Sequence, residues 1–223
     1  MFIRRSVFAK IHRHASTVRR NVPVCFSSAA AQWSDDEERD WSEDEEHQQP
    51  EEHLACNERY EGIVKITETP CKKGLGIYAS KDFAKGELVV SSNPIKTTST
   101  RCSHSVQIDW DDRHILMDIP AVLINHSCEA NVGIRTNSNK VRDDDGDEGA
   151  YDFLAINSIK KGEELTWDYE ATEWEISTPF RCTCGSAKCR GMLRGFKDSG
   201  EIIRKQYGEH YADYLKETTK NHI

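Results

Sequence analysis

The feature that most constrains this chain is a group of three cysteines in the sequence Cys182-Thr-Cys184-Gly-Ser-Ala-Lys-Cys189. Three thiols so close together, with Gly185 at the turn, suit one zinc ion, which binds four ligands in a tetrahedron. A structural zinc needs a fourth protein ligand, whereas a catalytic zinc keeps water there. Ordinary reduced cysteines are the alternative. A fourth donor has to come from a distant part of the chain, either a histidine or one of the remaining cysteines: Cys25, Cys56, Cys71, Cys102 and Cys128.

Charge is distributed unevenly along the 223 residues, whose formal net charge is −8. Residues 1–34 contain six basic residues and no acidic residue, with apolar residues at helical spacing, which is typical of a mitochondrial presequence. A featureless basic tail and a nuclear signal are the alternatives. Residues 35–52 contain eleven acids and one base. Because like charges repel and little apolar surface is available, we predict an acidic disordered linker over 35–59.

The composition excludes several classes of protein. No apolar run approaches the ~18 residues that a membrane-spanning helix needs, so we expect no membrane insertion. The part of the chain that follows the linker is mildly acidic and has no basic stripe, so we expect no direct nucleic-acid binding. Roughly 170 residues remain, enough for one domain with its own core. We expect this domain to be a monomer.

Short runs rich in Val, Ile and aromatic residues, separated by turns, predict a mainly β fold with minor helix (α+β). Two helices are expected, a short one near Ala121–Asn125 and a C-terminal one over 198–219, with Asp198 and Glu201 placed like a capping box. The predicted strands are Gly62–Glu68, Gly76–Ala79, Glu87–Ser91, Ser105–Asp109, Ala130–Thr136, Tyr151–Ala155 and Leu165–Tyr169.

Three further motifs carry polar or glycine residues in unusual groupings. Asn125-His126-Ser127-Cys128 follows an apolar run, Lys73-Gly74-Leu75-Gly76 precedes a strand, and Gly162 opens a segment that ends in Trp167-Asp168-Tyr169. Glycines allow the backbone to approach a ligand closely. Each motif by itself has an ordinary structural explanation, namely a turn or core packing.

Together with the cysteine cluster, these motifs make the sequence resemble the SET-domain protein-lysine methyltransferases that carry a post-SET zinc-binding segment. The segments that carry the resemblance are GLGIYASKDFAKGE (74–87), INHSCEANV (124–132), FLAINSIKKGEELTWDY (153–169) and CTCGSAKCRGML (182–193). The resemblance implies a SET domain over 60–170 and a post-SET zinc segment over 178–194. It also implies several small sheets with a knot-like threading of the 162–169 strand near 125–128.

The resemblance implies transfer of methyl groups from S-adenosylmethionine to a lysine side chain of a protein substrate, histone or non-histone. It makes Tyr169 the catalytic residue and places Trp167 and Tyr151 in the substrate channel. It makes Cys128 the fourth ligand of a structural zinc site with Cys182, Cys184 and Cys189. The cofactor-binding residues that it implies are Lys73, Gly74, Leu75, Gly76, Asn125, His126 and Phe180. The alternatives are a catalytically silent SET module that binds peptides or scaffolds a complex, and a zinc/thiol redox protein.

Overall fold

The computed structural model describes residues 51–70, 74–110, 112–137, 141–143 and 146–217. The predicted leader 1–34 and the first part of the predicted linker lie outside these residues. The helices and 3-10 turns are α1 (Glu51–Arg59), η1 (Ala121–Leu123), η2 (Tyr169–Ala171), α2 (Phe196–Tyr207) and α3 (Asp213–Lys216). The strands are β1 (Val64–Glu68), β2 (Leu75–Ala79), β3 (Leu88–Ser91), β4 (Pro94–Thr98), β5 (Ser105–Gln107), β6 (His114–Met117), β7 (Asn125–His126), β8 (Val132–Thr136), β9 (Val141–Asp143), β10 (Gly146–Glu148), β11 (Tyr151–Ala155), β12 (Glu164–Trp167), β13 (Phe180–Arg181) and β14 (Met192–Leu193).

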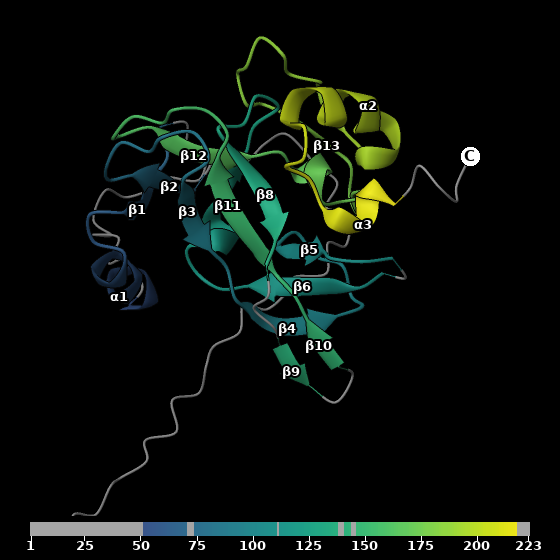
Figure 1. The fold of residues 1–223 in the computed structure, drawn as a ribbon, viewed down its shortest axis with the longest axis horizontal. Helices are drawn as coiled ribbons and strands as arrows, with labels where there is room; N and C mark the ends of the chain where they lie inside the picture. Colours follow the sequence, from purple (N-terminus) through teal and green to yellow (C-terminus); the bar gives the residue numbers. More distant parts are fainter. Residues whose placement is uncertain (1–50, 71–73, 111, 138–140, 144–145, 218–223) are drawn as a thin grey trace, which may run out of the picture.

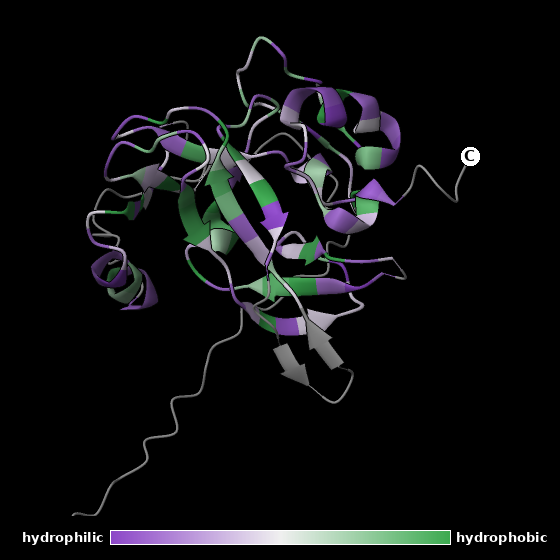
Figure 2. Ribbon diagram, viewed as in Figure 1, coloured by the Kyte–Doolittle hydropathy of each residue, from purple (hydrophilic) through white to green (hydrophobic). Residues whose placement is uncertain are grey.

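The strands form several small sheets, which confirms the predicted mainly β fold. One sheet has the order β1-β2-β12-β7, a second β3-β11-β8 and a third β4-β6-β5, and two hairpins join β9 to β10 and β13 to β14. In Figure 1, α1 lies beside β1 to β3 on one side of the molecule, and α2 and α3 lie on the opposite side. Figure 2 shows that the hydrophobic residues gather on the strands between these helices.

The core lies around the strands that are buried on both faces. All five residues of β11 and all four of β6 are buried, so these two strands are covered on each side. β12 instead alternates, with Leu165 and Trp167 buried and Glu164 and Thr166 half-buried. A strand that alternates in this way presents one face to the core and leaves the other for polar contacts.

β12 joins segments that are far apart in the sequence. It pairs antiparallel with β2 and parallel with β7, so that Thr166 lies opposite Asn125 and Trp167 opposite His126. The Asn131 side chain strengthens this junction, since its amide nitrogen donates to the Glu164 carbonyl at 2.8 Å and its oxygen accepts from the Thr166 amide at 2.9 Å. The predicted proximity of 162–169 to 125–128 is therefore confirmed.

The C-terminal helix predicted over 198–219 is two helices in the structure, α2 and α3. α2 begins at Phe196 and has no side-chain cap, so the predicted capping box of Asp198 and Glu201 is wrong. The chain enters α2 through Gly195, whose φ is +132° and where a Cβ atom would lie 2.4 Å from the Trp174 carbonyl oxygen. The helix ends at Gly208, with φ +60°. Positive φ favours glycine at both positions, and these glycines set the bounds of α2.

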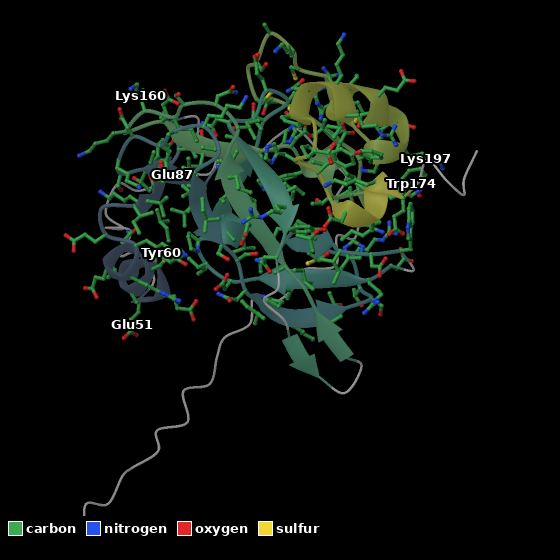
Figure 3. The ribbon with its side chains drawn as sticks, in the orientation of Figure 1. Glu51, Tyr60, Glu87, Lys160, Trp174 and Lys197 are labelled. Atoms are coloured by element: carbon green, nitrogen blue, oxygen red, sulfur yellow. The ribbon has the colours of Figure 1, made fainter. Side chains whose placement is uncertain are left out.

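The apolar stripe predicted for this region is buried although the helix is broken: Ile203, Tyr207, Tyr211, Tyr214 and Leu215 are each at most 8% exposed. Figure 3 labels Trp174 and Lys197 side by side next to α2 and α3, where the Lys197 amide donates to the Trp174 carbonyl at 3.1 Å. The two C-terminal helices thus pack directly on the segment that follows β12.

The acidic linker predicted over 35–59 is helical in its last nine residues, which form α1. Glu51 and Glu52 in its first turn and Arg59 in its last turn are favourable for the helix dipole. The main reason why this segment is ordered is its tertiary contacts. Cys56 is buried in the core, and the Asn57 side chain accepts from the Ile66 amide at 2.7 Å. Among the described residues, no helix has the length and hydropathy to cross a bilayer.

Candidate functional site

Four cysteines converge at the end of the molecule that contains β13 and β14. The sulfur atoms of Cys128, Cys182, Cys184 and Cys189 all lie within 4.8 Å of one another, and all four thiols are free. Cys128 comes from the turn after β7, and the other three come from the loop between β13 and β14. The structure therefore brings together the four cysteines that the resemblance implies as metal ligands.

The spacing of these sulfurs fits zinc. A tetrahedral Zn–S₄ site with bonds of ~2.3 Å has S···S edges of about 3.8 Å. The Cys128 and Cys182 sulfurs are 3.8 Å apart. The donor set of four thiolates is also typical of a closed structural zinc site. Leu193 and Ile176 pack beside the cluster, which keeps water away from it.

Burial acts strongly on the thiols of this cluster. It raises the pKa of Cys128, and it raises the pKa of Cys182 to about 11. For Cys184, burial is outweighed by backbone N–H groups and neighbouring thiols, and its pKa falls to about 6. A metal ion bound to the four sulfurs would stabilise all the thiolates together.

A second grouping forms where β2, β7 and β12 meet. The Asn125 side-chain nitrogen donates to the Leu75 carbonyl at 3.1 Å and to Glu164 Oε1 at 2.9 Å. A Cβ atom on Gly76 would lie 2.9–3.0 Å from Thr69, Asn125 and Glu164, so only glycine fits there. This orientation of the amide leaves the Asn125 oxygen with no hydrogen-bond donor within the described ranges. The grouping offers that oxygen and the Glu164 carboxylate to a ligand with an amino group.

His126 connects the cysteine cluster to Tyr169. Its Nδ1 atom lies 3.2 Å from the Tyr169 amide, and its Nε2 atom lies 3.4 Å from the Cys128 sulfur. The tautomer with the proton on Nε2 satisfies both contacts, because Nδ1 then accepts from the amide and Nε2 donates to sulfur. A hydrogen bond to a metal-ligating thiolate orients that ligand. His126 thus holds the backbone of Tyr169 and a zinc-site sulfur at fixed positions.

Tyr169 lies at the wall of a cavity of about 490 Å³. Its hydroxyl donates to the Ile124 carbonyl at 3.3 Å, and its ring lies 5.0 Å from that of Trp167 and 5.2 Å from that of His126. Burial, and to a lesser extent Glu164, raises the pKa of Tyr169 to about 12. The hydroxyl therefore stays protonated at neutral pH. Ile124, Trp167, Phe180 and Glu173 also line the cavity.

Charged residues on both sides of Tyr169 form a buried network. The Arg190 guanidinium donates to Asp168 Oδ1 at 2.6 Å and to Glu170 Oε2 at 2.7 Å. Glu170 Oε1 also accepts from the backbone amides of Arg194 and Gly195, each at 2.8 Å. Burial raises the pKa of Asp168, although Arg190 opposes it. An Arg that binds two carboxylates, one on each side of Tyr169, fixes the path of the chain through this residue.

The other predicted site residues lie in different surroundings in the structure. Gly74 and Leu75 lie at the start of β2, and Lys73 lies outside the described residues. Trp167 lines the cavity, as the resemblance implies. Tyr151 is 1% exposed, its hydroxyl donates to the Gln107 carbonyl at 2.7 Å, and it does not line the cavity, so it packs in the core instead. Phe180 is 37% exposed, and its ring stands 6.3 Å from that of His126.

Sequence reasoning missed several residues at the site. Glu170 and Tyr207 contact the network around Tyr169, and Glu173 lines the cavity, yet none of them lies in a motif with a recognisable spacing. Arg190 directly follows the last cysteine of the cluster, and its position there gives no sign of its role. Its carboxylate partners lie 20 and 22 residues earlier in the chain, and only the fold brings them together.

Comparison with known families supports the resemblance. Residues 74–170 match the family model described as SET domain. This segment contains β2 to β12, Asn125, His126 and Tyr169, and the cysteine cluster follows it. The chain therefore contains a SET domain.

Individual relatives are similar to part of this chain. A protein named methyltransferase flvH from Aspergillus flavus is 30% identical over 96 residues, which cover 42% of this chain and 48% of that protein. Histone-lysine N-methyltransferase ASHH2 from Arabidopsis thaliana is 36% identical over 93 residues, which cover 41% of this chain and 5% of that protein. The chain thus spans less than half the length of either relative. A crystal structure of KRYPTONITE in complex with mCHG DNA and SAH has a TM-score of 0.47 at 22% identity, covering 58% of this chain and 28% of that one.

Proposed function

We propose that this chain transfers methyl groups from S-adenosylmethionine to a lysine side chain of a protein. The observation that carries this proposal is that Tyr169 lines the cavity and its backbone is held by His126, within a segment that matches the SET domain and also contains Asn125. When bound, S-adenosylmethionine supplies an electrophilic methyl group on a positively charged sulfur. Gly74, Gly76, Asn125 and the Glu164 carboxylate offer the surface that would hold its amino-acid part.

The protein has to align the lysine nitrogen with the methyl group, and alignment of this kind lowers the activation barrier by up to ~7–11 kcal/mol. In our proposal, the aromatic rings of Trp167 and Tyr169 enclose the aliphatic part of the lysine side chain. The Tyr169 hydroxyl remains protonated at neutral pH, because burial raises its pKa to about 12. In this proposal, Tyr169 positions the amine through hydrogen bonding.

Zinc has a structural part in this proposal. Cys128, Cys182, Cys184 and Cys189 fill all four positions of a tetrahedral site, so no position remains for a reacting water molecule. The metal would hold the β13–β14 hairpin, and with it Phe180, at the edge of the cavity. A redox function for these thiols is disfavoured, because zinc binding would leave none of them free to react.

The alternative, a catalytically silent SET module, would keep the fold and the zinc site without transferring a methyl group. The retained Tyr169, Asn125 and His126, and the contact between His126 and Tyr169, favour an active enzyme. For the substrate we propose a protein with an accessible lysine, in mitochondria if the 1–34 leader acts as a presequence, or a histone otherwise.

The test is methyl transfer from labelled S-adenosylmethionine by the full-length chain to histones and, separately, to mitochondrial extract. We expect transfer to at least one of them by the wild type and a loss of at least about 100-fold in Tyr169→Phe. The variant should retain its zinc and its unfolding midpoint, because the hydroxyl makes one hydrogen bond, 3.3 Å to a carbonyl. Wild-type protein that binds S-adenosylmethionine but labels neither substrate would support the silent module instead.

A further inference from the structure

Glu173 is a nearly buried carboxylate at the wall of the cavity that Tyr169 also lines. Its side chain is 12% exposed. Its backbone amide donates to the Tyr169 carbonyl at 3.2 Å, so it lies one turn of chain beyond Tyr169. The Phe196 amide donates to the Glu173 carbonyl at 2.8 Å, which ties the same residue to the start of α2. Glu173 is therefore held rigidly by its backbone, close to the proposed site of methyl transfer.

The two oxygens of the Glu173 carboxylate have different surroundings. Oε1 accepts from the Gln107 amide at 2.8 Å and from the Thr172 hydroxyl at 3.4 Å. Oε2 has no hydrogen-bond donor in the part of the chain that the structure describes. The nearest cationic candidate is His114 Nδ1, 4.0 Å away and too far for a hydrogen bond. The first oxygen thus fixes the orientation of the carboxylate, and the second is left without a hydrogen bond within the described residues.

The nearby charged groups do not neutralise Glu173. Burial lowers the pKa of His114 to about 4, so its imidazole is neutral at physiological pH. The Arg101 guanidinium donates to the Asp112 carboxylate and, at 3.2 Å, to the Glu175 carbonyl. A buried carboxylate without a cationic partner is costly, and a cation that binds it recovers much of that cost.

Resting on the proposed function, we propose that Glu173 binds a cationic side chain of the protein substrate inside this cavity. The cation is the ammonium group of the target lysine or the basic group of a neighbouring lysine or arginine. The shape and chemistry of the cavity agree with such a ligand. Trp167, Tyr169 and Phe180 offer aromatic surface for an aliphatic stem and a positive charge, and Glu173 supplies the anion. Because the carboxylate is buried, a substrate with an apolar or acidic side chain in place of the cation is disfavoured.

The acid–base behaviour of Glu173 is consistent with this assignment. Burial raises the pKa of its carboxyl group to about 7, so the group is partly protonated in the empty cavity at neutral pH. A bound cation would favour the ionised form. At neutral pH, a bound basic side chain would therefore increase the negative charge on Glu173.

The test measures peptide binding and not catalysis, so that its failure differs from failure of the proposed function. The immobilised full-length chain, with S-adenosylhomocysteine present, captures peptides from two libraries with randomised flanking positions. One library has lysine at its centre and the other has norleucine, and the retained peptides are sequenced. Glu173→Gln removes the charge but keeps an oxygen that can accept from Gln107. Glu175→Gln is the matched control, because that carboxylate lies only two residues away but is paired with Lys197 at the surface.

We expect the wild type and Glu175→Gln to prefer a basic side chain, and Glu173→Gln to lose that preference by about tenfold or more. If the cation is a neighbouring residue, the lost preference is for Lys or Arg at one flanking position. If it is the target lysine, the lost preference is for the lysine library over the norleucine library. A wild type without either preference, or a Glu173→Gln variant that keeps both, would overturn the assignment. A wild type with the binding preference but no methyl transfer would count against the proposed function alone.

Discussion

The hydroxyl of Tyr207 on α2 provides the sharpest test of how the C-terminal helices support the site. It donates to Asp168 Oδ2 at 3.1 Å, and it accepts from the Gln206 side chain at 2.7 Å and the Ala130 amide at 3.3 Å. Asp168 has 1% of its side chain exposed. Within the described residues, Oδ2 has no other hydrogen-bond donor. Removal of the hydroxyl therefore leaves a charged oxygen without its donor in a buried place.

A hydrogen bond to a charged group contributes ~1.5–3 kcal/mol, so we expect Tyr207→Phe to lower the free energy of unfolding by about that amount. For a domain of this size, the midpoint of thermal unfolding should fall by roughly 3–12 °C. The matched control is Tyr211→Phe. The Tyr211 ring is buried to a similar degree, but its hydroxyl makes no hydrogen bond in the described part of the chain. We expect it to change the free energy of unfolding by less than ~0.5 kcal/mol.

The measurement is urea unfolding of zinc-loaded protein, followed by tryptophan fluorescence and circular dichroism. If the two variants lose equal stability, the hydroxyl network is not what couples α2 to the segment around Tyr169. If Tyr207→Phe is as stable as the wild type, the bond to Asp168 is replaced by water, and the reasoning from burial is wrong.

Three further predictions follow from the site. Cys128→Ser should lower the zinc retained after dialysis against a chelator as much as Cys184→Ser does, whereas Cys56→Ser should keep the metal, as measured by elemental analysis. Gly76→Ala should weaken S-adenosylhomocysteine binding by at least about tenfold in calorimetry, because the new methyl group would lie 2.9–3.0 Å from Thr69, Asn125 and Glu164. An unchanged affinity would mean that the cofactor binds elsewhere. The pKa of Glu173 in the folded state, about 7, lies above its unfolded value, so its contribution to stability is present below about pH 4.5 and is lost as pH rises to 7. Between pH 5 and 7.5, the free energy of unfolding of Glu173→Gln should therefore rise by up to ~3 kcal/mol relative to that of the wild type. A difference between the two proteins that does not change with pH in urea unfolding would refute this.

Much of the fold could be predicted from local sequence. Tyr151–Ala155 forms a strand with the predicted bounds, and β8 lies within the predicted Ala130–Thr136. β6 was missed because its four residues, His114–Met117, are all buried and show no alternation. Its strand conformation depends on pairing with β4 and β5 on either side. Short strands of this kind are determined by their neighbours and not by their own composition.

The site divides along similar lines. The spacing of Cys182, Cys184 and Cys189 indicates a metal site by itself, whereas Cys128 and Tyr169 could be named only through the resemblance to the SET-domain methyltransferases. The role of Arg190 could not be predicted, because only the path of the folded chain after β12 brings Asp168 and Glu170 into contact with it. Glu173 has no motif at all. Its importance comes from burial beside a cavity, which is a property of the folded chain.

The order of the four thiols along the chain has a consequence for the energetics of folding. Cys128 precedes Tyr169 and the other three follow it, so the cluster closes a loop that contains this tyrosine; Cys128 and Cys182 are 54 residues apart. A covalent crosslink over such a loop would remove about 4 kcal/mol of chain entropy from the unfolded state. A metal ion that joins the same positions acts as a reversible crosslink. Zinc supply would then set the fraction of molecules with a complete site, while each complete molecule would keep the same turnover.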